Sequence, residues 1–267
     1  MNETGERNGI KHPLQFLSSA AIKHIAIILM IVNHVSAAYF DNFAPDSTSF
    51  WSDAHWYFTR ASFVLFTFLI AEGLVHTRNR MRYVLNLTFF AFLSEVPYDL
   101  FRYGKFFSFS LQNVFFTLAL GALTVTVIDM LPKKLRFLSG TGVVILACAI
   151  SFLFKFEYSV LGVILIVLMY YFREKYILRL ILCGLALYLI PLAKGVASHL
   201  YYKDLWYVVK FYMKNSLLQF SGIAAFIPIA FYSGEKGRQL PKYFYYAFYP
   251  VHMLLIVLGI YLIKLVM

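Results

Sequence analysis

The stretch 19–40, SAAIKHIAIILMIVNHVSAAYF, is long and apolar enough to cross a membrane, yet it carries Lys23 and His34. The eleven-residue step between them is about three helical turns, which places both side chains on one face, about 16 Å apart along the axis. Ionisable groups at membrane depth usually face a cavity, a substrate or each other. The pattern indicates a functional site; the alternative is a histidine bonded to a carbonyl, with Lys23 extending to the headgroups.

Composition places the whole chain in a membrane. Its 267 residues are 61% hydrophobic, with a mean hydropathy of +0.70, which is too apolar for a soluble domain. The apolar runs are continuous, so they favour spanning helices over barrel strands. We expect an all-α polytopic integral-membrane helix bundle of about nine to ten transmembrane helices. Residues 1–18 are expected as a cytoplasmic leader, residues 19–267 as a single transmembrane domain, and the tyrosine- and lysine-rich segment 199–214 as an interfacial helix.

The basic residues indicate an orientation. The net charge is +11, but Lys and Arg lie in short clusters between the apolar runs and form no stripe that would suit nucleic acid. With nine spans and a cytoplasmic N-terminus, 14 of them fall on the cytoplasmic side and 8 on the other, the bias expected of cytoplasmic loops. Cys148 and Cys183 lie inside apolar runs without metal-ligand spacing, so we expect no metal site.

Two acidic residues of the third expected span lie near the depth of His34. In the stretch SEVPYDL, Glu95 is about as far from the cytoplasm as His34 and is expected to orient the imidazole, as in general acid–base catalysis. Asp99 lies one turn further out, where it is expected to serve an incoming acceptor. The alternative is that Pro97 kinks this helix and Glu95 bonds the freed backbone groups.

Cationic residues gather where the second expected span ends. His76, Arg78 and Arg80, in AEGLVHTRNR, lie at the same membrane face as Lys23. Together they suit an anionic, phosphate-bearing donor, although each arginine alone also suits an ordinary cytoplasmic anchor. His252, in the last span, is either a core histidine or one that positions the donor.

A second polar group is expected toward the external face. Asn113 begins the fourth span, Glu157 and Tyr158 form the turn between the fifth and sixth spans, and Arg60 lies within the second. We assign these four residues to the binding of an acceptor.

Several stretches together resemble the TraX family, from about Ile22 to Gly259: IKHIAIILMIVNH, FLIAEGLVHTRNRMRYVLNLTFFAFLSEVPYDL, NVFFTLALG, EYSVLGVILIVLMYYFR and YYAFYPVHMLLIVLG. The founding member of that family is an integral-membrane acetylase of the N-terminus of conjugative pilin. The spacing of Lys23 and His34 is also similar to a signature of acyltransferase family 3, in which the cation helps to hold acyl-CoA and the histidine serves catalysis. The chain departs from many relatives in carrying Asn33 and Glu157 where aspartate is common.

The resemblance implies an acyltransferase in a bacterial cytoplasmic membrane. It would transfer acetyl from cytoplasmic acetyl-CoA to an amine or hydroxyl of a peptide N-terminus, such as that of pilin, or of a saccharide, reached from the outer side. His34 would take the proton of the acceptor, and Lys23, His76, Arg78, Arg80 and His252 would hold the donor. The alternatives are a transporter or flippase for a lipid-linked or sugar substrate, which no inverted repeat favours, and a non-catalytic assembly subunit of a surface fibre.

Overall fold

The computed structural model describes residues 15–47, 49–198 and 205–267. In this part of the chain the secondary structure is helical, with two isolated bridges and no strands. The elements follow in this order: α1 (Ser19–Phe43), α2 (Phe50–Thr59), α3 (Ala61–His76), α4 (Arg80–Tyr103), α5 (Val114–Met130), α6 (Arg136–Leu153), α7 (Ser159–Tyr171), α8 (Tyr176–Ser198), α9 (Leu205–Phe220), a 3-10 turn (Ser221–Ala225), α10 (Phe226–Ala230) and α11 (Lys242–Val266).

Short polar side chains fix where three of these helices begin. Ser18, Asn79 and Asn113 precede α1, α4 and α5, and each accepts a hydrogen bond from a backbone N–H of the first turn. Such caps satisfy donors that have no partner within the helix. Helix α4 ends at Gly104, whose φ of 64° is a left-handed conformation that glycine adopts readily.

Helix α3 lies at the centre of the bundle. Twelve of its sixteen residues are buried, and Leu65, Phe68 and Leu74 are almost completely enclosed. A helix that is apolar on all sides needs neighbours on all sides. Helices α1, α5 and α7 pack against it, and α4 and α11 close a ring of contacts that runs through α1, α3, α5, α4 and α11.

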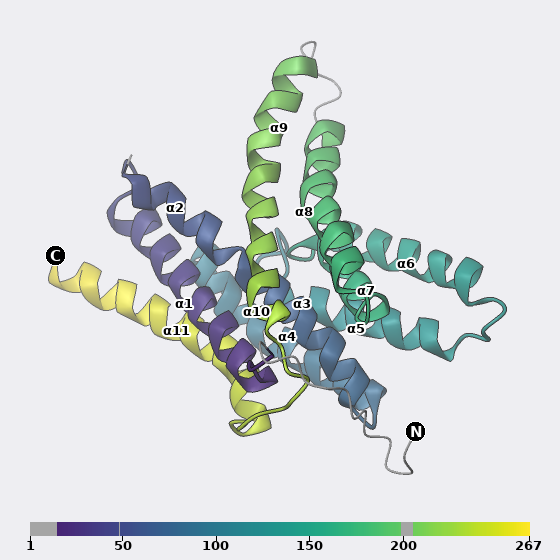
Figure 1. Ribbon diagram of the computed structural model, residues 1–267. Helices are drawn as coiled ribbons and strands as arrows, with labels where there is room; N and C mark the ends of the chain where they lie inside the picture. The colour runs from purple at the N-terminus through teal and green to yellow at the C-terminus, as the bar shows by residue number, and fades with distance from the viewer. Residues whose placement is uncertain (1–14, 48, 199–204) are drawn as a thin grey trace.

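Helices α8 and α9 form a hairpin that extends away from this ring, at the top of Figure 1. The hairpin joins the bundle through α7 and through the 3-10 turn, which packs on α3. At that contact a Cβ on Gly222 would lie 3.0 Å from Val64 Cγ2 and 3.3 Å from the carbonyl oxygen of Arg60, so only glycine allows this close approach without displacement. Helix α6 extends to the right in Figure 1 and packs beside α5 and α7.

The long apolar helices are those of an integral membrane protein. Six helical stretches are long and apolar enough to cross a bilayer: Ser19–Phe43, Phe50–His76, Arg80–Tyr103, Arg136–Leu153, Tyr176–Ala197 and Tyr243–Val266. Helices α5 and α7 are apolar but only 17 and 13 residues long. The all-helical class is confirmed, whereas the expected count of nine to ten spans is not confirmed within the described residues.

Two expected segment boundaries differ from the structure. The interfacial helix was expected over 199–214; residues 199–204 lie outside the described part of the chain, and 205–214 begin α9, which packs along α8. The following apolar run, 216–232, is not one helix, because α9 ends at Phe220 and the 3-10 turn and α10 follow. Of the expected leader, residues 1–14 lie outside the described residues, and Leu17 pairs with the backbone of Phe231 and Ser233.

Candidate active site

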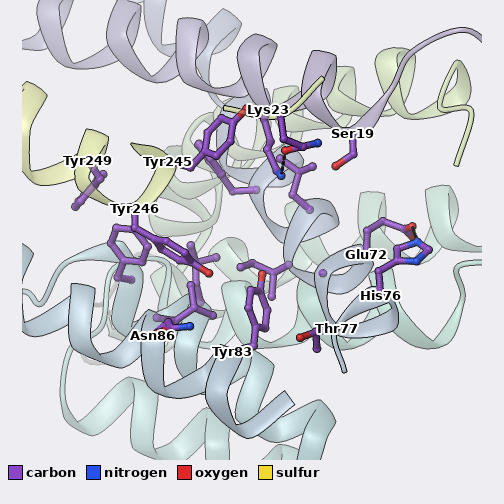
Figure 2. Close-up of a pocket in the computed structure, with 18 of the residues that line it drawn as sticks. Ser19, Lys23, Glu72, His76, Thr77, Tyr83, Asn86, Tyr245, Tyr246 and Tyr249 are labelled. Atoms are coloured by element: carbon purple, nitrogen blue, oxygen red, sulfur yellow. Dashed lines mark hydrogen bonds and ion pairs between the residues drawn. The ribbon is translucent and has the colours of Figure 1, made fainter. Parts of the chain in front are cut away.

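A first cavity of about 680 Å³ lies within the ring formed by α1, α3, α4, α5 and α11. One end of it lies where α1 begins, α3 ends and α4 begins, together with the loop before α11. Figure 2 shows Lys23 and Tyr245 on one side of this space and His76, Thr77 and Tyr83 on the other. Two of the predicted donor-binding residues, Lys23 and His76, therefore come from different helices to one cavity.

That end of the first cavity is strongly basic. We call the following five lining residues the cationic mouth: Lys23, His76, Arg78, Arg82 and Lys236. Lys23 Nζ donates to Gln239 Oε1 at 2.7 Å and lies 4.9 Å from the centre of the Tyr245 ring. Arg78 and Arg82 are exposed. The sequence prediction of a cationic entrance that joins Lys23 to His76 and Arg78 agrees with this geometry.

One carboxylate balances part of this charge. The buried Glu72 lies 3.5 Å from His76 Nε2 and 3.5 Å from Arg173 Nε, and its Oε2 accepts a hydrogen bond from the Tyr232 hydroxyl. Four of the five mouth residues have no carboxylate within ion-pair distance among the described contacts. The mouth therefore keeps cationic groups for an anionic ligand.

Arg80 lies outside this cavity, contrary to the prediction that it binds the donor. Its Nε donates to the carbonyl oxygen of Leu74 at 3.0 Å, and its guanidinium bonds Asp129 Oδ2 at 2.5 Å and the Tyr170 hydroxyl at 2.6 Å. The side chain turns from the start of α4 toward α5 and α7, where Asp129 supplies the partner that a half-buried arginine needs. Arg80 thus joins helices, and Arg82 takes its place at the mouth.

Tyrosines line the middle of the first cavity. Tyr83, Tyr246 and Asn86 face it from α4 and α11 (Figure 2). Tyr83 packs so closely on α3 that a Cβ on Gly73 would lie 2.7 Å from its hydroxyl oxygen. The inner end is apolar and includes Met30. A long ligand would therefore meet charge first, then hydroxyl groups, and then an apolar end.

His34 lies one turn beyond Met30 and pairs with His252 rather than with a carboxylate. His252 Nδ1 is 2.9 Å from the carbonyl oxygen of Phe248, which can only accept, so that nitrogen carries the proton. His252 Nε2 must then accept, and His34 Nδ1 donates to it at 2.7 Å. This chain leaves His34 Nε2 unprotonated and available as a base. His252 was expected to be either a core histidine or one that positions the donor; the structure places it beside His34 and outside the lining of the first cavity.

Glu95 does not orient His34, which corrects the sequence prediction. The α4 ring that packs on His34 is Phe101, 5.3 Å between centroids. Glu95, nearly two turns earlier, accepts hydrogen bonds from the side chain and the backbone of Asn113 at the start of α5. Asp99 Oδ2 accepts from the backbone of Ser108 at 2.6 Å. Glu95, Asp99 and Asn113 therefore stabilise the connection between α4 and α5, although Glu95 Oε1 and Asp99 Oδ1 are buried without a partner.

Tyr249 connects the first cavity to the histidine pair. Its ring lines the cavity and lies 6.4 Å from the His34 ring and 5.7 Å from the His252 ring, centroid to centroid. Its hydroxyl is buried and has no hydrogen-bond partner. Sequence reasoning missed this residue; the signal was its position three residues before His252, which puts both on one face of α11.

A second cavity, of about 1130 Å³, lies at the other end of α3. Arg60, Glu157 and Tyr158, all predicted to bind an acceptor, line it together, whereas Asn113 does not. Arg60 donates to the Tyr158 hydroxyl at 3.2 Å and lies 5.0 Å from the Trp56 ring. The remaining wall comes from the ends of α6 and α8 and from α9.

The turn that carries Glu157 is held from both sides. Gln112 N donates to the carbonyl oxygen of Lys155 at 3.0 Å, and Glu157 N donates to that of Gln112 at 2.9 Å. The Tyr158 ring stacks on Phe63 of α3, 3.5 Å between centroids. Burial raises the pKa of Glu157 to about 7, an effect that Arg102 and Arg60 reduce by their charge.

The two cavities lie toward opposite ends of α3, and His34 lies at the level of the end that carries the second cavity. Sixteen residues of helix make about 24 Å. Asn33 Nδ2 donates to Thr59 Oγ1 at 2.6 Å, so the turn of α1 that carries His34 lies at the level of Arg60. Neither cavity lining includes His34 itself, but Tyr249 of the first cavity touches its ring.

Comparisons with known proteins identify the family of this chain. A family described as "TraX protein" matches residues 18–261. The chain belongs to the TraX family. It is also similar to a probable fimbrial assembly protein FimC, serogroup H1, of Dichelobacter nodosus, with 27% identity over 260 residues that cover 90% of this chain and 94% of that protein. No solved structure matches. The TraX match includes the cationic mouth, both cavities and the histidine pair.

Metal ligands do not gather in the described residues, where no group of three or more His, Cys, Asp or Glu side chains could hold an ion. Cys183 is buried and Cys148 is half-buried in α6.

Proposed function

We propose that this TraX protein is an acyltransferase of the bacterial cytoplasmic membrane that moves an acetyl group from acetyl-CoA to an amine or hydroxyl. One observation carries the proposal: a single cavity leads from a cationic mouth to Tyr249, whose ring contacts a histidine with a free Nε2. A donor with phosphates at one end and an acyl group at the other matches this cavity, because its phosphates would lie at the cationic mouth and its acyl group near Tyr249. The mouth and the N-terminus would then face the cytoplasm.

The donor would lie along the first cavity. Lys23, Arg78 and Arg82 supply charge-assisted hydrogen bonds to phosphates, and the tyrosine hydroxyls of the middle section face the amide groups of a pantetheine arm. The apolar inner end near Met30 accommodates a short acyl group. No residue of the cavity has to form a covalent bond with the donor.

Acyl transfer at the inner end of the first cavity needs a general base and a hydrogen-bond donor that stabilises the developing oxyanion. His34 Nε2 would remove the proton of the attacking amine or hydroxyl and pass it to the departing sulfur, and His252 would hold the ring in that tautomer. The Tyr249 hydroxyl, buried without a partner, would donate to the thioester oxygen as negative charge develops there.

The description of the relative indicates one class of acceptor. The Dichelobacter nodosus protein is described as a probable fimbrial assembly protein. We therefore infer that the acceptor belongs to a surface fibre, and that the N-terminus of a pilin-like subunit is the first candidate to test. A saccharide acceptor is the second.

The test is acetyl transfer by purified protein in proteoliposomes, with radiolabelled acetyl-CoA, peptides with a free N-terminus and amino sugars. Loss of transfer in His34→Ala, with normal rates in His24→Ala on an exposed position of the same helix, supports the proposal. Vectorial uptake of an acceptor without any transfer would instead make the protein a carrier. Equal rates in the wild type and in His34→Ala would refute the role of His34.

A further inference from the structure

Three large side chains from different helices line the inner end of the first cavity. Met30 of α1, Phe115 of α5 and Tyr249 of α11 are each at most 9% exposed. Of the α1 residues that line the cavity, Met30 is the one farthest from the start of the helix, where the cationic mouth lies. Figure 2 shows Tyr249 at the side of the cavity away from His76. We call Met30, Phe115 and Tyr249 the cavity floor.

Two members of the cavity floor are held in place by contacts between helices. The rings of Phe115 and Tyr249 pack edge to face, 5.2 Å between centroids. Phe115 lies in the first turn of α5, where its backbone N–H donates to Asn113 Oδ1 at 3.0 Å. The Asn113 side chain donates in turn to the carbonyl oxygen of Ala91 on α4 at 2.8 Å. Neither ring can therefore move far without breaking contacts among α4, α5 and α11.

Met30 is the adaptable member of the cavity floor. A methionine side chain is unbranched, has three rotatable bonds and fills irregular spaces. Met30 also lies one helical turn before His34 on α1, and side chains four residues apart on a helix lie on the same face, one above the other. The length of the Met30 side chain therefore decides how far a ligand in the first cavity can extend toward His34.

The position of the floor limits the acyl group of a donor. In the proposed reaction the thioester carbonyl lies at the Tyr249 hydroxyl, with the rest of the acyl chain beyond it. Each added methylene needs space that Met30 occupies, and a packed interior does not accommodate extra methylenes without cost. A longer acyl chain would therefore push the thioester carbon back toward the cationic mouth, away from Tyr249 and His34.

We propose that Met30 sets the acyl-chain length of the donor: the first cavity admits acetyl and propionyl thioesters, and the Met30 side chain excludes longer acyl groups. This inference rests on the proposed acyl transfer. It makes Met30 a specificity-determining residue, which neither binds a phosphate nor moves a proton.

Binding without catalysis is the first measurement. Radiolabelled acetyl-CoA bound to the purified protein in detergent is displaced by unlabelled acetyl-, propionyl-, butyryl- or hexanoyl-CoA, or by CoA with a free thiol. The wild type should bind hexanoyl-CoA at least about tenfold more weakly than acetyl-CoA, because one methylene too many in an apolar pocket already costs about this factor. Propionyl-CoA should bind about as well as acetyl-CoA.

Variants of Met30 then assign this discrimination to one side chain. Met30→Ala should raise the affinity for hexanoyl-CoA relative to acetyl-CoA at least about tenfold, and should leave the affinity for free CoA unchanged. Met30→Leu, of similar volume, should keep the wild-type ratio. Met30→Val removes less of the side chain and should give a smaller shift in the same direction, which keeps the test open if Met30→Ala does not fold. Met81→Ala, exposed on α4 and outside both cavity linings, is the matched control.

Three results would overturn the inference. The first is equal affinity of the wild type for hexanoyl-CoA and acetyl-CoA, and the second is the same ratio in the wild type and in the Met30 variants. The third is an equally large shift in Met81→Ala. Failure of every CoA thioester to bind would overturn both the inference and the proposed donor site.

Transfer rates distinguish the inference from the proposed function. In proteoliposomes with a peptide acceptor, Met30→Ala should raise kcat/KM for butyryl-CoA relative to acetyl-CoA at least about tenfold. Acetyl transfer with the same chain-length profile in the wild type and in Met30→Ala would refute the role of Met30 and leave the acyltransferase in place. The expected binding profile without transfer of any acyl group would leave the role of Met30 in place and refute the acyltransferase.

Discussion

The hydrogen bond between His34 and His252 gives a quantitative prediction. His252→Phe keeps a ring of similar size but removes the acceptor of the His34 Nδ1–H bond, which is 2.7 Å long. A buried hydrogen-bond donor without a partner costs about 1–3 kcal/mol. In the variant this cost destabilises the His34 tautomer that carries its proton on Nδ1, which is the tautomer that leaves Nε2 free to act as a base. Because 1.36 kcal/mol is a factor of ten in rate, we expect kcat to fall about 10- to 100-fold.

The control is His252→Gln, whose side-chain oxygen can accept the same hydrogen bond, so it should retain a larger part of the wild-type kcat. The assay is the initial rate of CoA thiol release in proteoliposomes at saturating acetyl-CoA. His34→Ala should lose more than His252→Phe, because general base catalysis contributes about 10²–10⁴. A His252→Phe variant as fast as the wild type, or a Gln variant as slow as Phe at equal expression, would show that the pair does not set the tautomer.

Three further predictions follow from the site. Arg78→Ala should raise the KM for acetyl-CoA with little change in kcat, because Arg78 lies at the cationic mouth. Arg80→Ala should leave that KM unchanged and lower the free energy of unfolding by about 1.5–3 kcal/mol, because it removes the bond to Asp129. Steady-state kinetics and thermal unfolding in detergent distinguish the two effects. Tyr249→Phe should lower kcat about 10²-fold at unchanged KM, and a normal kcat would exclude the hydroxyl as the oxyanion donor. The Glu157 carboxyl is neutral below its pKa of about 7 and charged above it, so the KM for a peptide amine should fall as the pH rises through about 7. Glu157→Gln should lose this pH dependence of the KM. The same pH dependence in Glu157→Gln as in the wild type would contradict the assignment of Glu157 to acceptor binding.

Sequence reasoning anticipated the parts of the fold that depend on composition and helical spacing. The all-helical membrane class follows from continuous apolar runs, and the shared face of Lys23 and His34 follows from eleven residues of helix. Lys23, His76 and Arg78 do meet at one cavity, because charged clusters at helix ends gather at the same membrane face.

The errors concern side-chain direction and partners across helices. Depth alone suggested that Glu95 reaches His34, but depth does not fix rotation about the α4 axis, and Phe101 occupies the position beside the ring. In the same way, Arg80 and Arg82 are indistinguishable in a basic cluster until Asp129 on α5 is known to bond the first of them. Such choices depend on contacts between distant segments, which a local pattern does not contain.

The shortness of α7 has a consequence for the surrounding lipid. Thirteen residues make a helix about 20 Å long, against about 30 Å for the hydrocarbon of a typical bilayer. Hydrophobic mismatch of this size is met by local thinning of the bilayer or by screening from longer neighbours, and α6 and α8 flank α7. If the bilayer adapts to α7 in this way, the hydrocarbon beside the Glu157 turn is thinner than the average of the bilayer. Reconstitution in lipids of increasing chain length should therefore slow turnover before it unfolds the protein.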